Sequence, residues 1–238
     1  MNKVYFVGAG PGDPRLITVR GMDLVKKADV LIYAGSLVNQ ELVALSAAKV
    51  KLDSWGMSLG ELLNAMESGV TAGKLVVRLH SGDPSLYGAV VEQIVELEKR
   101  GIFAEIIPGV SSLFSAAAAL QTQLTLKGVA ETLIVTRPAG LTLEKDRIRD
   151  LSRYGATMVV FLGTEKIEDI LSAVEYSADT PVAVVYHASW KDELVIKGTV
   201  ADIVEKVRAA TIEKTALIII GRVVNPKTSG YQRSVLYS

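Results

Sequence analysis

The segment VYFVGAGPGD, at residues 4–13, is a short apolar run that ends in a turn rich in glycine. β-branched and aromatic residues followed by Gly and Pro are typical of a buried strand that leads into a tight turn. The apolar part is too short for the core of a signal peptide, and glycine and proline interrupt it at once. The segment therefore predicts a strand at residues 3–7 with a glycine loop at its carboxyl end.

Outward from this segment, short β-branched runs alternate with longer segments of helical period. This alternation predicts parallel strands joined by crossover helices, which is an α/β fold. Further strands of the first half, each bounded by Gly, Pro, Asp or Ser, are expected at residues 30–33, 50–52, 75–79 and 103–107.

Two helices of the first half have ends that the sequence predicts. Ser58 and Glu61 have the spacing of a capping box, and apolar residues recur after them at helical spacing, with Gly69 as the expected end. A second helix is expected to begin after Pro84, because proline is compatible with a first helical turn, and to run to Arg100.

The second half of the chain has a different character. A run of small apolar residues at 113–120 gives way to a polar stretch at 121–128, so a junction is expected there, with domains at residues 1–118 and 119–238. Two strands with only a short loop between them at residues 182–197 predict antiparallel pairing and hence a mixed second sheet. Further strands are expected at 132–136, 158–162 and 216–220, with shorter helices between them and a last helix opened by Thr199 and Asp202.

The composition excludes several classes of function. Lys plus Arg equals Asp plus Glu at 26 each, so no net charge exists to hold nucleic acid or an anionic membrane surface. Charged residues interrupt every apolar run before the roughly 20 residues that a membrane helix needs, and a soluble protein is expected. The absence of cysteine excludes disulfides, thiolate metal sites and a cysteine nucleophile, and it suits a reducing cytoplasm.

The chain has only two histidines, His80 and His187. Without cysteine, a protein-bound metal would need several carboxylates to complete its ligands, so no metal site is expected. Neither histidine has the adjacent nucleophile and acid of a hydrolase triad, and acyl transfer is not expected either.

The glycine loop at residues 8–13 lies between a strand and a helix, where backbone N–H groups are placed to receive a ligand. Asp13 stands where a dinucleotide-binding fingerprint needs its third glycine, and its carboxylate would repel a pyrophosphate. No P-loop lysine follows. The loop is therefore either a ligand site of another kind or a tight turn without a ligand.

Two further loops are expected at the same edge of the parallel sheet. RLHSGDP at residues 78–84 and PGVSS at 108–112 each follow a strand, and ligands of such sheets bind outside the carboxyl ends of the strands. Asp83 either accepts hydrogen bonds from a ribose or an ammonium group, or caps the helix expected after Pro84. The serines of PGVSS have the same two alternatives. Three loops at one edge predict a ligand cleft.

Taken together, these motifs resemble the tetrapyrrole methyltransferase family over essentially the whole chain. The family-wide marks are VGAGPGDPRLITVRG at residues 7–21, RLHSGDPSLYG at 78–88, PGVSS, and TALIIIGRVV at 215–224. A narrower resemblance, to the cobalt-precorrin-4 carbon-11 methyltransferases, is carried by IYAGSLV (32–38), DSWGMSL (53–59), LTLKGVAETLIVTR (124–137), VVYHASWKDE (184–193) and the closing RSVLYS.

The resemblance implies two α/β domains with S-adenosylmethionine bound in the cleft between them, and a homodimer. It implies methyl transfer to carbon 11 of precorrin-4 or its cobalt form, in cobalamin biosynthesis. Two alternatives stay open, another methyltransferase of the family, such as a uroporphyrinogen-III enzyme, and a non-catalytic nucleotide-binding module.

Matched motif by motif, the resemblance also implies which residues contact the methyl donor. Many of them would act through backbone atoms, so apolar residues are included, although Leu162 and Ala188 are equally compatible with core packing. The implied donor contacts are Pro11, Ser81, Gly82, Asp83, Leu86, Ser111, Ser112, Leu162, Ala188 and Ala216.

The chain departs from the family at one place. Uroporphyrinogen methyltransferases carry an aspartate just after the second strand, proposed as a proton acceptor, whereas Tyr33-Ala34-Gly35-Ser36 stands here. No general base is therefore assigned from the sequence. The substrate carries many carboxylates, for which Arg78, Arg137 and Lys191 are candidate partners, each equally compatible with a solvated surface position.

Overall fold

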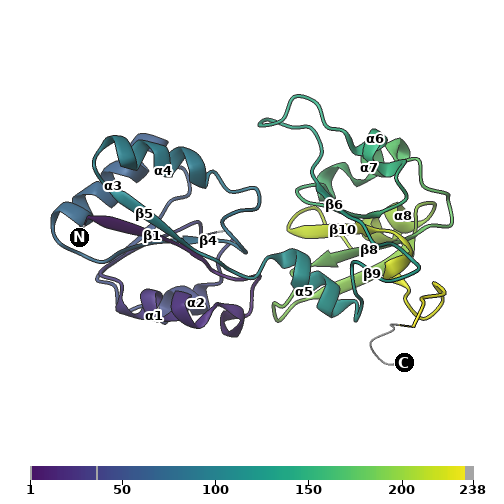
Figure 1. Cartoon of the computed structure of the whole chain (residues 1–238), viewed down its shortest axis with the longest axis horizontal. Coiled ribbons are helices and arrows are strands. Elements are labelled where there is room, and N and C mark those ends of the chain that lie inside the picture. Colours follow the sequence, from purple (N-terminus) through teal and green to yellow (C-terminus); the bar gives the residue numbers. More distant parts are fainter. Residues whose placement is uncertain (1, 36, 234–238) are drawn as a thin grey trace. The chain divides into compact units, whose positions relative to one another are not determined.

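The computed structural model describes residues 2–35 and 37–233, so Ser36 of the IYAGSLV motif and residues 234–238 of RSVLYS lie outside the described residues. The chain forms two compact units, Met1–Ser112 and Leu113–Ser238 (Figure 1). The junction expected between residues 118 and 119 lies near the C-terminal end of α5 (Ser112–Ala119), the helix that begins at this division.

The first unit is built on a five-stranded sheet in the order β3-β2-β4-β1-β5. Every neighbouring pair is parallel, as the alternation of strands and helices predicts. The predicted strands are confirmed, and their ends lie within one residue of the expected positions: β1 (Lys3–Gly8), β2 (Val30–Tyr33), β3 (Val50–Asp53), β4 (Val76–His80) and β5 (Phe103–Ile107).

Helices cover both faces of this sheet, two on each (Figure 1). Successive residues of a strand point to opposite faces, so Val7 of β1 packs with α1 and α2, while Phe6 packs with α3 and α4. The four helices are α1 (Val19–Lys27), α2 (Gln40–Ala44), α3 (Leu59–Thr71) and α4 (Val90–Lys99).

The capping box predicted for α3 is confirmed. Ser58 Oγ accepts a hydrogen bond from Glu61 N at 3.3 Å, and Glu61 Oε2 accepts one from Ser58 N at 2.8 Å. The predicted end at Gly69 is wrong, because α3 continues to Thr71. A Cβ on Gly69 would lie 2.6 Å from Val76 Cγ2, so this glycine allows the helix to approach the sheet closely rather than ending it.

The predicted start of α4 after Pro84 is also wrong, since the helix begins at Val90. Residues 84–89 form turns, in which Tyr87 adopts φ +52°, a conformation that an α-helix excludes. Gly88 lies against the ring of His80, because a Cβ there would lie 2.3 Å from His80 Nε2. The segment after β4 is therefore a shaped loop.

The second unit has the mixed sheet that the sequence predicts. β6 and β7 are parallel, and the other neighbouring pairs in the order β6-β7-β10-β8-β9 are antiparallel. Its strands are β6 (Leu133–Thr136), β7 (Thr157–Val160), β8 (Pro181–Tyr186), β9 (Leu194–Thr199) and β10 (Ala216–Ile220).

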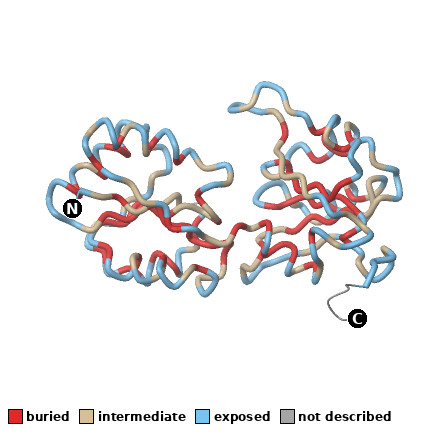
Figure 2. Tube along the Cα trace, in the orientation of Figure 1, coloured by how far each residue is buried: buried red, intermediate tan, exposed pale blue. Residues whose placement is uncertain are grey.

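Helices cover both faces of the second sheet, and their buried residues form two cores with the strands (Figure 2). α5 packs against the face that carries Val159 and Leu217, whereas the other three helices pack against the face that carries Met158 and Ile218. These three are α6 (Ile148–Ser152), α7 (Ile167–Ala173) and α8 (Ile203–Ala209). Short 3-10 helices are found at Pro14–Leu16, Thr164–Lys166 and Arg222–Val224.

The predicted start of α8 is confirmed, because Asp202 Oδ1 accepts from Thr199 N at 2.7 Å immediately before Ile203. Within the described part of the chain, every helix is too short or too polar to cross a bilayer.

Candidate functional site

Three loops meet at the carboxyl edge of the first sheet, after its neighbouring strands β4, β1 and β5. They are called here the β1 loop (residues 9–13), the β4 loop (81–89) and the β5 loop (108–111). Gly82 N donates to Gly10 O at 2.9 Å, and Gly10 N donates to Gly82 O at 3.2 Å. An isolated antiparallel bridge therefore joins the β1 and β4 loops beyond the last regular residues of the parallel sheet.

The three loops pack on one another through glycine backbone. A Cβ on Gly109 would lie 2.1 Å from Gly82 O and 2.7 Å from Gly8 Cα. A Cβ on Gly8 would lie 2.5 Å from Gly109 Cα. Only residues without side chains fit at this meeting point, which explains why glycine follows each strand here.

Asp83 joins the β4 and β5 loops. Its Oδ2 accepts from Gly109 N at 2.7 Å, while Oδ1 accepts from Ser85 N at 2.8 Å and from the Ser85 hydroxyl. Burial raises the pKa of Asp83, but these hydrogen bonds outweigh it and hold the pKa below the ordinary value. Asp83 does not cap α4, which begins at Val90, so the helix-cap alternative is wrong.

Asp13 is engaged by its own loop. Its carboxylate accepts from Arg15 N at 2.8 Å and forms an ion pair with the Arg15 guanidinium, at 2.6 Å between Nη2 and Oδ2. The hydrogen bonds from Arg15 lower the pKa of Asp13. On the other side, Asn39 Nδ2 donates to Gly12 O at 3.0 Å. These contacts hold the carboxyl-terminal end of the β1 loop.

The structure brings together the donor contacts expected from the first unit. Pro11 and Gly82 are buried, Ser81 and Leu86 are half-buried, and Ser111 is buried at the end of the β5 loop. Ser112 is half-buried and begins α5. With Asp83, all of them lie on the three loops or directly after them.

Three further expected contacts come together at one edge of the second sheet. Leu162 follows β7, Ala188 follows β8, and Ala216 begins β10, which is antiparallel to both strands. Thr164 Oγ1 donates to Ala216 O at 3.2 Å, which ties the loop after β7 to β10. Ala188 belongs to the core, whereas Leu162 is 69% exposed and does not pack there.

The same edge has unusual backbone conformations. Leu162, His187, Ser189 and Thr215 all have positive φ, between 46° and 71°. Such values are uncommon for residues with a side chain and tend to occur at functional sites. Their concentration marks this edge as a candidate binding surface.

The three candidate substrate partners occupy different environments. Arg78 is 7% exposed and lies within β4, where Nη1 donates to Leu79 O at 3.2 Å. Arg137 is half-buried and donates to Thr142, and Lys191 is exposed in the loop after β8. Burial lowers the pKa of Arg78 to about 10, which keeps it cationic at neutral pH. Arg78 is thus not a solvated surface residue.

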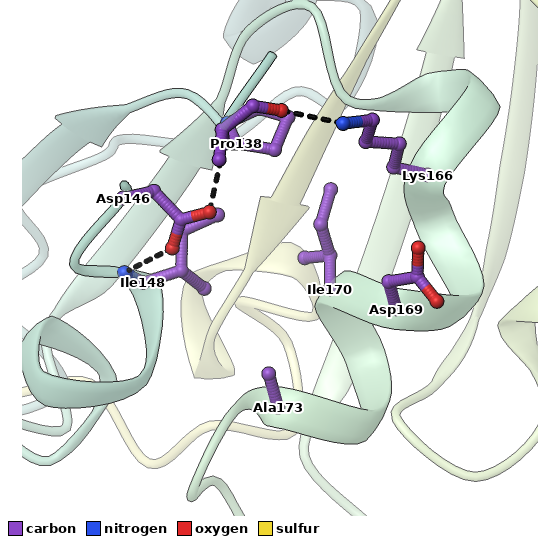
Figure 3. Close-up of a pocket in the computed structure, with 8 residues that line it drawn as sticks. Pro138, Asp146, Ile148, Lys166, Asp169, Ile170 and Ala173 are labelled. Atoms are coloured by element: carbon purple, nitrogen blue, oxygen red, sulfur yellow. Dashed lines mark hydrogen bonds between the residues drawn. The ribbon is translucent and has the colours of Figure 1, made fainter. Parts of the chain in front are cut away.

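A cavity of about 260 Å³ in the second unit is lined by none of the expected contacts (Figure 3). Asp146 at its rim accepts from Ala139 N at 2.8 Å and Ile148 N at 3.0 Å, and Lys166 Nζ donates to Ala139 O at 2.6 Å. Asp146 and Lys166 thus hold the loop between β6 and α6. We interpret this cavity as structural.

Comparison with known proteins places the chain in a family. A family model described as Tetrapyrrole (Corrin/Porphyrin) Methylases matches residues 3–204. The chain belongs to the tetrapyrrole methylase family. The resemblance identified from the sequence motifs is thereby confirmed.

Two relatives of this tetrapyrrole methylase are both named as cobalt-precorrin-4 methyltransferases. A cobalt-precorrin-4 C(11)-methyltransferase from Methanocaldococcus jannaschii is 52% identical over 237 residues, covering 97% of this chain and 92% of its own. The X-ray structure of a cobalamin biosynthetic enzyme, a cobalt precorrin-4 methyltransferase, is 42% identical with a TM-score of 0.91, over 94% of this chain and 96% of that one.

A third tetrapyrrole methylase has been solved with a bound product of methyl transfer. The uroporphyrin-III C-methyl transferase from Thermus thermophilus, complexed with S-adenosyl homocysteine, is 28% identical with a TM-score of 0.80. The match covers 94% of this chain and 94% of that one.

The residues of the first unit fit such a ligand better than they fit a dinucleotide. Asp83 stands on the converging loops, and its carboxylate suits hydroxyl groups and a cationic ligand rather than a pyrophosphate. A carboxylate has about four acceptor positions, so Asp83 retains capacity beyond its contacts with Ser85 and Gly109. The prediction of a ligand site of another kind agrees with this chemistry.

Sequence reasoning missed one arrangement in the tetrapyrrole methylase. His187 stacks between Tyr186, at 3.8 Å between ring centroids, and Trp190, at 5.0 Å, and its Nδ1 lies 2.9 Å from Asp192 Oδ2. The spacing of aromatic residues in VVYHASWKDE was the available signal. Among the described residues, no group of three or more His, Asp and Glu is arranged to hold a metal.

Proposed function

We propose that this protein transfers a methyl group from S-adenosylmethionine to carbon 11 of precorrin-4 or its cobalt form, in cobalamin biosynthesis. The observation that carries the proposal is 52% identity to a cobalt-precorrin-4 C(11)-methyltransferase across nearly the whole length of both chains. The solved cobalt precorrin-4 methyltransferase, with a TM-score of 0.91, supports the same assignment. The uroporphyrin-III enzyme, at 28% identity and 0.80, is a weaker match, so that alternative is less supported.

The ten residues named from the motifs are proposed as the donor contacts. Gly82 and its neighbours supply backbone groups, Asp83 supplies a carboxylate for ribose or ammonium, and the serines of PGVSS supply hydroxyls. In the second unit, Leu162, Ala188 and Ala216 would act mainly through their backbones. Their position at one sheet edge in each unit supports this assignment.

S-adenosylmethionine supplies a methyl group that is activated by its sulfonium. The sulfur leaves as a neutral thioether and needs no acid catalysis. What remains for the chain is to align the reactants and to exclude water. The interlocked glycine loops perform the first task, because Asp83 and Gly109 hold the β4 and β5 loops in a fixed relation. The nucleophile is an electron-rich ring carbon of the substrate, so no covalent enzyme intermediate is required.

Two arginines and a lysine are proposed as partners of the substrate carboxylates. Lys191 is exposed in the loop after β8. Arg137 donates to Thr142, so its own guanidinium is already oriented. Arg78 is buried, and its contribution is a fixed positive charge beneath the sheet edge.

The proposed activity is tested by incubating the purified protein with S-adenosylmethionine and one tetrapyrrole at a time. Precorrin-4 or cobalt-precorrin-4 should yield S-adenosylhomocysteine and a product heavier by one methylene, as measured by mass spectrometry. Uroporphyrinogen III should not react. Turnover of uroporphyrinogen III alone would support the other member of the family.

We also propose a homodimer located in the cytoplasm, on the basis of the family resemblance and the absence of cysteine. Light scattering should then give about twice the chain mass of 25.5 kDa. A mass of one chain at micromolar concentration would contradict the dimer.

A further inference from the structure

The carboxyl edge of the first sheet also includes the ends of β2 and β3, which carry none of the glycine loops. The strand order β3-β2-β4-β1-β5 places the glycine loops after β4, β1 and β5, and leaves the ends of β2 and β3 side by side beyond β4. Neighbouring strands lie roughly 5 Å apart, so these ends are within reach of a large ligand bound at the glycine loops.

Asp53, the last residue of β3, reaches across to the end of β2. Its Oδ1 accepts from Gly35 N at 2.9 Å and from Trp55 N at 2.9 Å. A Cβ on Gly35 would lie only 2.1 Å from Asp53 Oδ2. The carboxylate of Asp53 therefore occupies the space in which a side chain at position 35 would begin.

This carboxylate is held ionised and accessible. Backbone hydrogen bonds from Trp55 and Gly35 lower the pKa of Asp53, and the charge of Arg78 acts in the same direction. Asp53 is exposed, and both of its hydrogen bonds use Oδ1. Oδ2 remains able to accept a further proton or hydrogen bond.

Arg78 supports the charge of Asp53 from inside the sheet. The arginine is buried within β4, and its Nε has no hydrogen-bond partner. Isolated buried cations are costly, so a counter-charge nearby is expected. Asp53 is the carboxylate whose charge acts on Arg78.

The surface around Asp53 suits a broad planar ligand. Trp55 is 76% exposed although its turn is fixed, because Ser54 N donates to Tyr33 O at 2.8 Å and Met57 N to Ser54 O at 3.2 Å. An exposed indole on a fixed turn, beside a carboxylate, offers an apolar face to a macrocycle and an acceptor to its N–H groups.

We propose that Asp53 is a catalytic residue whose Oδ2 accepts the proton that the macrocycle releases after methylation. The inference rests on the proposed function. The C–S bond breaks with its electron pair passing to sulfur, and the new C–C bond forms with an electron pair of the ring. With metal-free precorrin-4, the macrocycle is left as a conjugated cation that carries N–H protons, and one of them passes to Asp53 Oδ2, which restores the ring's charge. A carboxylate is a sufficient base because the donor of the proton is a cation.

The first test is the variant Asp53→Asn, with Asp29→Asn as the matched control. The amide oxygen of Asn still accepts from Gly35 N and Trp55 N, but it is not a base. We expect kcat to fall by about 10²-fold or more, as loss of a general base predicts, with donor affinity and Tm unchanged. Asp29 is also an exposed aspartate that accepts a backbone hydrogen bond, from Leu75 N at 2.8 Å, but it lies at the opposite end of the strands, and its variant should retain kcat.

The second test moves the carboxylate from one strand to the other. Asp53→Gly should lose activity, and the double variant Asp53→Gly with Gly35→Asp should recover most of it, because the two side chains share the same space. A residue that merely pins the turn would not be replaced in this way, since a carboxylate introduced at position 35 cannot accept the same two hydrogen bonds.

Retention of kcat by Asp53→Asn, or no recovery in the double variant while Tm stays at the wild-type value, would overturn the role of Asp53. A loss of kcat accompanied by an equal loss of donor affinity would also overturn it. Absence of turnover by the wild-type protein would instead overturn the proposed function, and the role of Asp53 with it.

Discussion

At the scale of single residues, the site depends on backbone approaches that no side chain permits. A Cβ on Gly109 would lie 2.1 Å from Gly82 O, whereas a Cβ on Gly60 would meet nothing within 4 Å. We predict that Gly109→Ala separates the loops, weakens donor binding by about tenfold or more and costs about 1–3 kcal/mol of stability. Gly60→Ala, in α3, should raise stability by about 0.5–1 kcal/mol.

Calorimetric titration with S-adenosylhomocysteine and urea denaturation measure the two effects. A Gly109→Ala protein that binds the ligand as the wild type does would show that the glycine contact is not required for the site.

Asp83 leads to a second prediction at this scale. Asp83→Ala should weaken donor binding by about 1.5–3 kcal/mol, because a charge-assisted contact is lost and the β5 loop loses its tie through Gly109 N. Ser85→Ala removes only the hydroxyl contact to the same carboxylate and should leave donor affinity nearly intact. If Asp83→Ala instead lowers folding stability and leaves donor affinity unchanged, the residue is purely structural.

The contacts of Asp83 and Asp53 illustrate which features of the site the sequence alone could predict. The motifs identified Asp83 as important, but its partner Gly109 lies 26 positions away, and only the folded sheet brings the two together. Asp53 was not singled out as a functional residue for the same reason, since its place beside Gly35 depends on the pairing of β2 with β3. Glycine and proline marked the loops, whereas tertiary contact decides what each side chain does.

At the scale of elements, the strands were predicted well because each apolar run is bounded by turn-forming residues. The helix ends were predicted less well. Gly69 was interpreted as a stop signal, but close packing on Val76 accounts for it, and Pro84 was interpreted as a helix start, but it opens a loop. In both cases a tertiary contact overrode the local preference.

Glu175, which follows α7, pairs with Arg149 in α6 and with Arg153 directly after α6. These ion pairs predict that the stability of the protein depends on pH. Its carboxylate bonds to Arg153 at 2.9 Å and to Arg149 at 3.0 Å, and these contacts lower its pKa from the ordinary 4.5 to about 2. Because the folded-state pKa is depressed, the stabilisation is fully present above about pH 5 and is lost as the pH falls towards 2. Glu175→Gln should therefore lower the free energy of unfolding at neutral pH, and its difference from the wild type should shrink as the pH falls.

Urea denaturation at about pH 7 and about pH 3 measures this difference. Glu165→Gln is the control, because Glu165 meets Lys214 at 3.4 Å on the open surface and such pairs contribute little. A Glu175→Gln difference that stays constant across this range would contradict the assigned ion pairs.

At the scale of the whole molecule, each unit gathers its expected donor contacts at one edge of its sheet. At this edge of the second unit, four residues adopt positive φ angles. The sequence did not predict these conformations because none of the four residues is glycine. The family and its chemistry were predictable from several long motifs in order. Three features could be recognised only in the folded chain. They are the burial of Arg78, the stacking of His187 and the hydrogen bond from Gly35 N to Asp53.

Carbon-13 NMR shows which ring carbon is methylated in the product formed from precorrin-4, or its cobalt form, and S-adenosylmethionine labelled in its methyl group. Position selectivity requires that one ring carbon lie about 3–3.5 Å from the methyl, in line with its sulfur bond. We predict a single labelled methyl at carbon 11. A labelled methyl at any other ring carbon, or no labelled product with either form of precorrin-4, would contradict the account.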